Sequence, residues 1–370
     1  MSSSPRKRPA SDVLVAGVVV AILIALVVAV FLSGAGSSLY PPQAVTAQGR
    51  ETRGLYDIVF AFAAAIFLLV EGLIVWSVIR YRRRPADTDL PVQTHGNNLV
   101  EVIWTLIPTG IVLFLFVISW QTLIHVDTVS ASPDIRIHAI AGQFQWQFEY
   151  LDANGKKVAT QLAPAYDPGT GVGGMAVPVG RSVQVTLDSP DVIHAFYVPR
   201  FLFKRDVVPG QTNKFEFTVD ENEAGQVFRG QCAELCGTGH RTMLFNVIAL
   251  SPADYDAWLE ALVEKSNATP APAPSGGAVL NVVAKDIKFD VATLDAPADK
   301  PFTVAFKNDD PAGITHNVEI KDSSGAILQP QDPIDGGTST NYAFEPLKAG
   351  TYTFFCSIHP APMTGTLNVK

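Results

Sequence analysis

Cysteine is scarce in this chain of 370 residues, which has only three, and methionine is almost as rare, with four. Three cysteines allow at most one disulfide within the chain, so a disulfide framework cannot carry the fold. No C-x-x-C-H segment occurs anywhere, which excludes a fused domain with a covalently attached c-type haem. Charged residues make up only 17% of the chain and the net charge is −8, and we expect no nucleic acid partner.

Apolar residues, by contrast, make up 48% of the chain and gather in three long runs. These runs are Val13 to Leu32, about 58–79 and about 99–123. Each run is long enough to cross roughly 30 Å of hydrocarbon as a helix, so we expect contact with membrane lipid. Clusters of basic residues precede the first run and follow the second, and such clusters stay on the cytoplasmic side. The sequence therefore predicts a transmembrane helical hairpin over 55–124, with everything after about residue 124 outside the cytoplasm.

The first apolar run, within residues 1–36, has two interpretations. Its basic start and the small-residue stretch "SGAGSS" favour a cleaved signal peptide, whereas its length favours an extra transmembrane helix. We prefer the signal peptide, because the two later runs already form a complete hairpin. Both interpretations place the C-terminal region on the outer side, in a multi-pass protein of the plasma membrane.

Two β-rich regions follow the hairpin. Short alternating runs such as "SVQVTLDS" and "NKFEFTVD", bounded by Gly and Pro, predict strands within a first domain over 125–265 that ends in a helix. Pro, Ala, Ser and Gly dominate 266–278, which predicts a semi-extended linker whose ends lie roughly 20 Å apart. Strands resume over 279–370. Both regions are typical of small all-β sandwiches.

The stretch "QCAELCGTGHRTM" concentrates metal-binding side chains at residues 231–243. Cys232 and Cys236 could form a disulfide, but a disulfide requires neither His240 nor Met243. Thiolate, imidazole and thioether together favour copper, and zinc is a weaker alternative because methionine is not a usual zinc ligand. Two thiolates this close can bridge two metal ions, which then need a second histidine. His194 in "SPDVIHAFYVP" is the candidate, although a lone histidine is more often an ordinary half-buried residue.

These motifs resemble a known family. The order of "VEVIWTLIP", "SPDVIHAFYVP", "FKRDVVPGQTN" and "GQCAELCGTGHRTM" over residues 55–250 is similar to subunit II of heme–copper cytochrome c oxidases. The resemblance implies a cupredoxin-like Greek-key sandwich with a dinuclear copper centre, CuA. In it Cys232 and Cys236 bridge both coppers and His194 and His240 each bind one. Met243 is a weak ligand, and Glu234 contributes its backbone carbonyl.

The resemblance also assigns roles around the centre. The Glu234 carboxylate could bind a Mg or Mn ion shared with subunit I. Phe144 stands where the family usually has the tryptophan that receives electrons from cytochrome c, and Trp146 follows two positions later. Glu101 matches the family glutamate at the mouth of a proton-uptake channel. An alternative role for Glu101 is to cap the start of its helix.

A second soft-ligand motif lies near the C-terminus. "FFCSIHPAPMTGTL" contains Cys356, His359 and Met363, and "GITHNVEI" upstream contains His316. One cysteine, two histidines and a methionine are the ligand set of a type 1 (blue) copper site. The region resembles plastocyanin-like cupredoxins, which implies a second Greek-key sandwich. Every cysteine, four of the seven histidines and two of the four methionines belong to the two motifs.

The resemblance predicts the subunit through which electrons enter a respiratory heme–copper oxidase that reduces O₂ and pumps protons. Its partners would be subunits I and III and a soluble donor, either cytochrome c or a copper protein. We expect electrons to pass from the donor to the C-terminal site, then to CuA and to haem in subunit I. The alternatives are the CuA subunit of a nitric oxide reductase and, less compatible with two cysteines and two histidines, a copper carrier.

Overall fold

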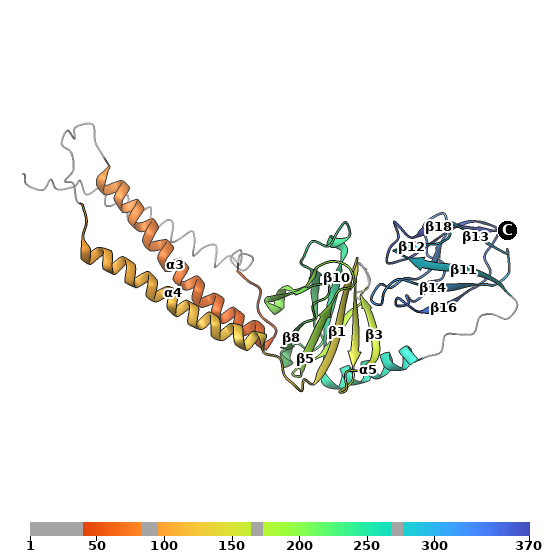
Figure 1. Cartoon of the computed structure of the whole chain (residues 1–370), viewed down its shortest axis with the longest axis horizontal. Helices are drawn as coiled ribbons and strands as arrows, with labels where there is room; N and C mark the ends of the chain where they lie inside the picture. Colours follow the sequence, from red (N-terminus) through yellow and green to blue (C-terminus); the bar gives the residue numbers. More distant parts are fainter. Residues whose placement is uncertain (1–39, 83–94, 164–172, 268–276) are drawn as a thin grey trace, which may run out of the picture. The chain divides into compact units, whose positions relative to one another are not determined.

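The computed structural model describes residues 40–82, 95–163, 173–267 and 277–370 (Figure 1). The predicted N-terminal segment, 1–36, and most of the predicted linker lie outside these residues. The described chain divides into two compact units. One contains a pair of long helices, and the other comprises Val45–Ala47 and Asp127–Lys370.

The first unit is a helical hairpin formed by α3 (Ala47–Tyr81) and α4 (Asn98–Asp127), which run side by side (Figure 1). The rings of Phe62 and Phe114 meet between them, 5.8 Å apart. Helix α3 begins well before the apolar run that predicted it, because its polar first turns are stabilised by an ion pair from Arg53 to Asp57 at i,i+4.

Both helices are long and apolar enough to cross a membrane, and they expose most of their apolar side chains. Leu68, for example, is 66% exposed. An apolar surface of this extent is compatible with lipid and not with water.

The second unit begins with a sandwich of two five-stranded sheets. Their strand orders are β3-β2-β1-β5-β8 and β4-β10-β9-β6-β7. The strands are β1 (Ile135–Gly142), β2 (Gln145–Leu151), β3 (Lys157–Ala163), β4 (Gly174–Pro178), β5 (Ser182–Asp188), β6 (His194–Val198), β7 (Phe203–Val207), β8 (Asn213–Thr218), β9 (Val227–Cys232) and β10 (Leu244–Leu250). Side chains alternate between buried and partly exposed along β5 and β10, as expected for strands with one face in a core.

A second sandwich follows, with two four-stranded sheets of order β12-β11-β14-β16 and β13-β18-β17-β15. Its strands are β11 (Ala278–Lys285), β12 (Lys288–Phe289), β13 (Thr293–Ala296), β14 (Phe302–Asn308), β15 (Glu319–Lys321), β16 (Ser339–Phe344), β17 (Gly350–Phe355) and β18 (Thr364–Val369). Each sandwich encloses its own cluster of buried apolar residues. The predicted fold class, a helical hairpin followed by two all-β sandwiches, is confirmed.

Helix α5 (Pro252–Asn267) closes the first sandwich. Ser251 caps its first turn, where its hydroxyl accepts a hydrogen bond from the backbone N–H of Asp254 at 3.2 Å. Tyr255 and Trp258 pack against Tyr150 of β2. The helix extends through Asn267, two residues into the predicted linker, because nothing before Pro270 interrupts a helix there.

Candidate metal centres

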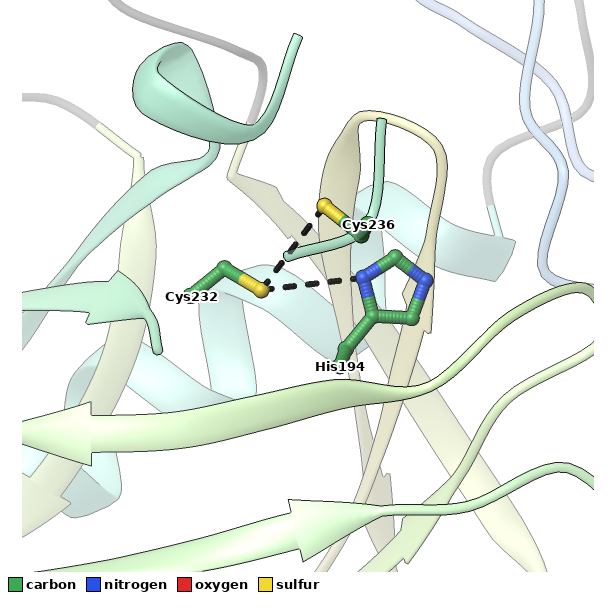
Figure 2. A group of neighbouring side chains, drawn as sticks. All are labelled: His194, Cys232 and Cys236. Carbon is green, nitrogen blue, oxygen red and sulfur yellow. Dashed lines mark hydrogen bonds between the residues drawn. The ribbon is translucent and has the colours of Figure 1, made fainter. Parts of the chain in front are cut away.

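The first site lies where β6 begins and β9 ends. His194 is the first residue of β6, Cys232 is the last of β9, and Cys236 lies in the loop that joins β9 to β10 (Figure 2). The Cys232 sulfur is 3.7 Å from His194 Nδ1 and 3.9 Å from the Cys236 sulfur. The sulfurs are therefore unbonded, since a disulfide bond is about 2.05 Å long.

The same loop supplies three more donor atoms. The Cys236 sulfur is 3.5 Å from His240 Nδ1 and 3.9 Å from the Met243 sulfur. The Glu234 carbonyl oxygen is 3.3 Å from the Cys232 sulfur. The other four atoms predicted to bind metal thus lie within 3.9 Å of one of the two buried cysteine sulfurs.

Asp191 fixes the orientation of His194. Its Oδ1 lies 2.9 Å from His194 Nε2, so Nε2–H donates to the carboxylate and the Nδ1 lone pair faces Cys232. Asp191 Oδ2 also accepts a hydrogen bond from the backbone N–H of Gln143 at 2.7 Å. Burial lowers the pKa of His194, but the hydrogen bonds to Asp191 and Cys232 outweigh burial and raise it.

The two thiols differ in acidity. Burial raises the pKa of Cys232, but hydrogen bonds with His194 and the backbone reverse the effect and lower it below its usual value. Burial and the adjacent Cys232 sulfur raise the pKa of Cys236. Cys232 therefore loses its proton more readily than Cys236, and metal binding must displace any proton that remains on the pair.

The second site repeats this arrangement at the end of β17. The Cys356 sulfur is 3.7 Å from His316 Nδ1 and 3.9 Å from His359 Nδ1, and the two Nδ1 atoms are 3.1 Å apart. All three side chains are buried, and Met363 is completely buried in the same core. Burial lowers the pKa of His316 to about 4 and lowers that of His359, which favours the neutral, metal-binding form of both rings.

Two side chains support the second site. Asp310 Oδ2 accepts a hydrogen bond from His316 Nε2 at 2.7 Å, as Asp191 does for His194. The Asn317 side chain donates to Ser357 Oγ and accepts from the Ser357 backbone N–H, both at 2.8 Å. Asn317 therefore ties the segment that carries His316 to the residue after Cys356.

Both donor sets fit copper. In the first, two sulfurs 3.9 Å apart can share a metal whose bonds to sulfur are about 2.3 Å long. In the second, one thiolate and two imidazole nitrogens, with a methionine on the same loop, form the trigonal set typical of blue copper.

Phe144 and Trp146, predicted to lie where electrons enter, occupy different environments. Phe144 packs directly on the metal-binding loop, where a β-carbon added to Gly239 would lie 2.3 Å from its ring. Trp146 is fully buried between Phe196 and Phe245. Of the two, only Phe144 borders the first site at the protein surface.

The two predicted glutamates make local contacts in this chain. The Glu234 carboxylate pairs with Lys204. Glu101 Oε1 accepts a hydrogen bond from the backbone N–H of Asn97 at 3.2 Å, and Asn97 Oδ1 accepts one from Leu99 at 3.1 Å. Asn97 thus caps the first turn of α4, and Glu101, four positions later, returns a hydrogen bond to the Asn97 N–H, which is compatible with the alternative role considered for Glu101.

Sequence reasoning missed Asp191, Asp310, Asn317 and Gln143. For the aspartates a signal existed, since Asp191 precedes His194 by three positions and Asp310 precedes His316 by six. Buried histidine ligands commonly donate their second N–H to a carboxylate. Gln143 has no comparable signal, because only the folded loops place it beside both sites.

The fold and the two sites first define a class, a membrane-anchored protein with two metal-binding β-sandwiches. Residues 34–122 match the family described as "Cytochrome C oxidase subunit II, transmembrane domain", and residues 135–250 match "Cytochrome C oxidase subunit II, periplasmic domain". Residues 257–369 match "Cupredoxin-like domain".

Similar proteins narrow this class to one family. A probable cytochrome c oxidase subunit 2 of Streptomyces coelicolor is 34% identical over 262 residues, which is 63% of this chain and 81% of the relative. Cytochrome c oxidase subunit 2 of Synechocystis is 31% identical over 66% of this chain and 82% of its own. The solved periplasmic domain of subunit II from Bradyrhizobium japonicum is 30% identical, with a TM-score of 0.33, over 37% of this chain and 99% of that one. The chain belongs to the cytochrome c oxidase subunit 2 family, whose members are subunits of an oxidoreductase.

Proposed function

We propose that this chain is the subunit through which electrons enter a respiratory heme–copper oxidase. The observation that carries the proposal is the convergence of two buried thiols, two imidazoles and a thioether at the end of β9. In the proposed assembly, subunit I holds the haem and the O₂ chemistry, and subunit III is a further partner.

In this proposal Cys232 and Cys236 would hold a dinuclear copper centre, and His194, His240, Met243 and the Glu234 carbonyl would supply the remaining ligands. His316, Cys356, His359 and Met363 bind one copper in the C-terminal domain. Copper at these sites supplies carriers for single electrons. The fold of the chain brings the ligand atoms close together, which would keep their geometry similar in both redox states.

Residues around the ligands support this role by excluding water. His194, Met243 and Met363 have no exposed surface. Phe144 covers the loop at Gly237 and Gly239, where an added β-carbon would lie within 3.0 Å of its ring. A dry site limits solvent rearrangement during electron transfer and so favours speed.

We place both β-sandwiches, assigned to 125–265 and 279–370, on the outer face of the plasma membrane, because basic residues follow α3. There they would meet a soluble donor. Acidic residues outnumber basic ones after residue 124, which favours a basic partner surface. The Mg or Mn ion at Glu234 would require its carboxylate to leave Lys204 when subunit I binds.

Metal analysis of the full chain, purified with its partner subunits, tests the proposal. We expect three coppers from this chain in addition to the metals of subunit I, a near-infrared band from the first site and a blue absorption from the second. Zinc in the first site, or a Cys232–Cys236 disulfide in the native complex, would contradict it. Oxygen consumption, rather than nitric oxide reduction, by the same complex tests the assigned reaction.

A further inference from the structure

The two metal-binding sandwiches contact each other through polar side chains close to both sites. Thr315 Oγ1 donates to Gln145 Oε1 at 2.7 Å, and Gln147 Nε2 donates to Asp335 at 3.2 Å. Thr315, Gln145 and Gln147 are almost fully buried, with exposures of 1%, 2% and 0%. These contacts exclude water from the area between the ligand loops.

Glycine allows the two surfaces to approach closely. A β-carbon added to Gly313 would lie 2.5 Å from Ile140 of β1, and φ at Gly313 is +93°. A β-carbon added to Gly142 would lie 3.0 Å from Ile314. Larger residues at these two positions would therefore push the ligand loops apart.

Gln143 lies at the centre of this contact and is bonded in three directions. Its carbonyl oxygen is 2.6 Å from His359 Nε2, the ring nitrogen of His359 that faces away from Cys356. Its side-chain amide donates to the carbonyl oxygen of Cys236. Its backbone N–H donates to Asp191, which accepts from His194. Gln143 thus contacts His359 of the second site and Cys236 of the first site directly, and it is connected to His194 through Asp191.

We propose that Gln143 is the bridge by which an electron crosses from the C-terminal site to the first site, an inference that rests on the proposed function. The direct path runs from His359 to the Gln143 carbonyl, along the Gln143 side chain, and across its amide hydrogen bond to Cys236. A second branch runs through Asp191 to His194. The site at Cys356 loses one electron and the site at Cys236 gains it, while no bond breaks and no proton moves.

The physical reason is that electronic coupling decays less steeply through covalent and hydrogen bonds than across a van der Waals gap. The direct path contains two hydrogen bonds and no gap. The aromatic neighbours offer no equivalent. Trp146 is buried in the core with its Nε1–H unpaired, and the side chain of Phe144 has no polar atom with which to form a hydrogen bond.

The test uses the full chain with copper in both sites, and the C-terminal site is reduced by a light pulse. The absorption of each site is then followed as the C-terminal site is reoxidised and the first site is reduced. Gln143→Leu keeps the backbone carbonyl and the size of the side chain but removes the amide donor to Cys236. We expect the first-order rate to fall roughly tenfold or more, because the electron must then cross a van der Waals gap in place of the hydrogen bond to Cys236. Gln147→Leu, the same change at the same contact but off the path, should leave the rate unchanged.

Hydrogen–deuterium exchange of the metal-free chain separates bridging from docking. Residues 142–147 and 313–316 should keep their protection in Gln143→Leu, so that a slower rate reports the lost bridge. Gln143→Asn provides a second probe, because it retains the amide but shortens the side chain by one methylene, and it should also slow transfer.

Three results have distinct meanings. An unchanged rate in either Gln143 variant, with protection retained, overturns the bridge. Loss of protection in both variants also overturns it, because Gln143 would then only hold the domains together. Absence of the near-infrared and blue bands in the wild-type chain would instead contradict the proposed function itself.

Discussion

The two sandwiches are versions of one architecture that hold different numbers of ligands. In the first, β5 pairs parallel to β1 and antiparallel to β8, and in the second β14 pairs parallel to β11 and antiparallel to β16. Likewise β10 pairs with β9 and β4 as β18 pairs with β17 and β13. The metal-binding loops therefore join equivalent strands.

The loops also share their hydrogen bonds. The backbone N–H of Cys232 donates to the Met243 carbonyl at 3.0 Å, and that of Cys356 donates to the Met363 carbonyl at 3.0 Å. Each methionine N–H donates in turn to the carbonyl of the preceding loop histidine. Met363 thus occupies the position of Met243, which supports its assignment as a ligand.

The difference between the loops is length. Eleven positions separate Cys232 from Met243, whereas seven separate Cys356 from Met363. The longer loop has room for Cys236, and a second thiolate is what allows two metals to be bridged. A change in one loop, on the same pairing of equivalent strands, would therefore distinguish the proposed dinuclear site from the proposed mononuclear one.

The largest expected effect comes from removing one thiol at a time. Cys236→Ser should abolish the near-infrared band of the first site and leave the blue absorption intact, because the second loop does not depend on it. Cys356→Ser should do the reverse. Absorption spectra and copper content of the purified chain measure both, and loss of both bands in either variant would show that the sites are not independent.

Deleting 279–370 tests whether the second sandwich feeds the first. We expect turnover with the native donor to collapse, while reduction of the first site by a small artificial reductant stays normal. Tethering holds the second site near the first at an effective concentration on the order of millimolar, which a free donor would not reach. Cys356→Ser is the matched control, since it keeps the domain and removes its metal. Unchanged turnover in the deletion would mean that the donor reaches the first site directly.

The two supporting aspartates should have intermediate and parallel effects. Asp191→Asn and Asp310→Asn each replace a charged acceptor of a histidine N–H with a neutral amide. Mutations of such partners typically cost roughly 10–100-fold in metal affinity. Competition with a copper chelator measures each affinity at its own site. Equal weakening of both sites by one substitution would contradict the assignment of one aspartate to each histidine.

The fold and most of the candidate ligands could be predicted from local patterns, whereas His194 and His316 lie 38 and 40 positions from their cysteines and were assigned through the family resemblance. Apolar length marks the two helices, alternation marks the strands, and Cys232, Cys236, His240 and Met243 are close together in the chain. What escaped prediction depends on distant contacts. Gln143 lies 216 positions from the histidine it contacts, and nothing local in "GQFQW" distinguishes its role from that of a turn residue.

The smallest expected effect is a difference between the two sandwiches in how their stability depends on pH. On the first sandwich His138 lies between Glu149 and Asp188, at 3.0 and 2.7 Å, and Lys157 also pairs with Glu149. Within 277–370 the only histidines are His316 and His359, both at the metal site. The hydrogen bond to Glu149 raises the pKa of His138 despite its burial. Burial raises the pKa of Glu149, but His138 and Lys157 outweigh it and lower that pKa to about 2.

These shifts define a window of stability. A histidine with a raised pKa stabilises the fold below its unfolded pKa of about 6.5, and this contribution is lost as the pH rises through the folded value. The lowered pKa of Glu149 adds stability above about pH 4.5, which is lost as the pH falls toward 2. His138→Gln should therefore lower the melting temperature most between about pH 4.5 and 6.5, by a few degrees or on the order of 1 kcal/mol, and least near pH 9. Loss of the near-infrared band on heating reports unfolding of the first sandwich, and loss of the blue band reports unfolding of the second. The temperature at which the blue band is lost should not depend on the substitution. A melting difference that is constant across this pH range would mean that His138 contributes by packing rather than by charge.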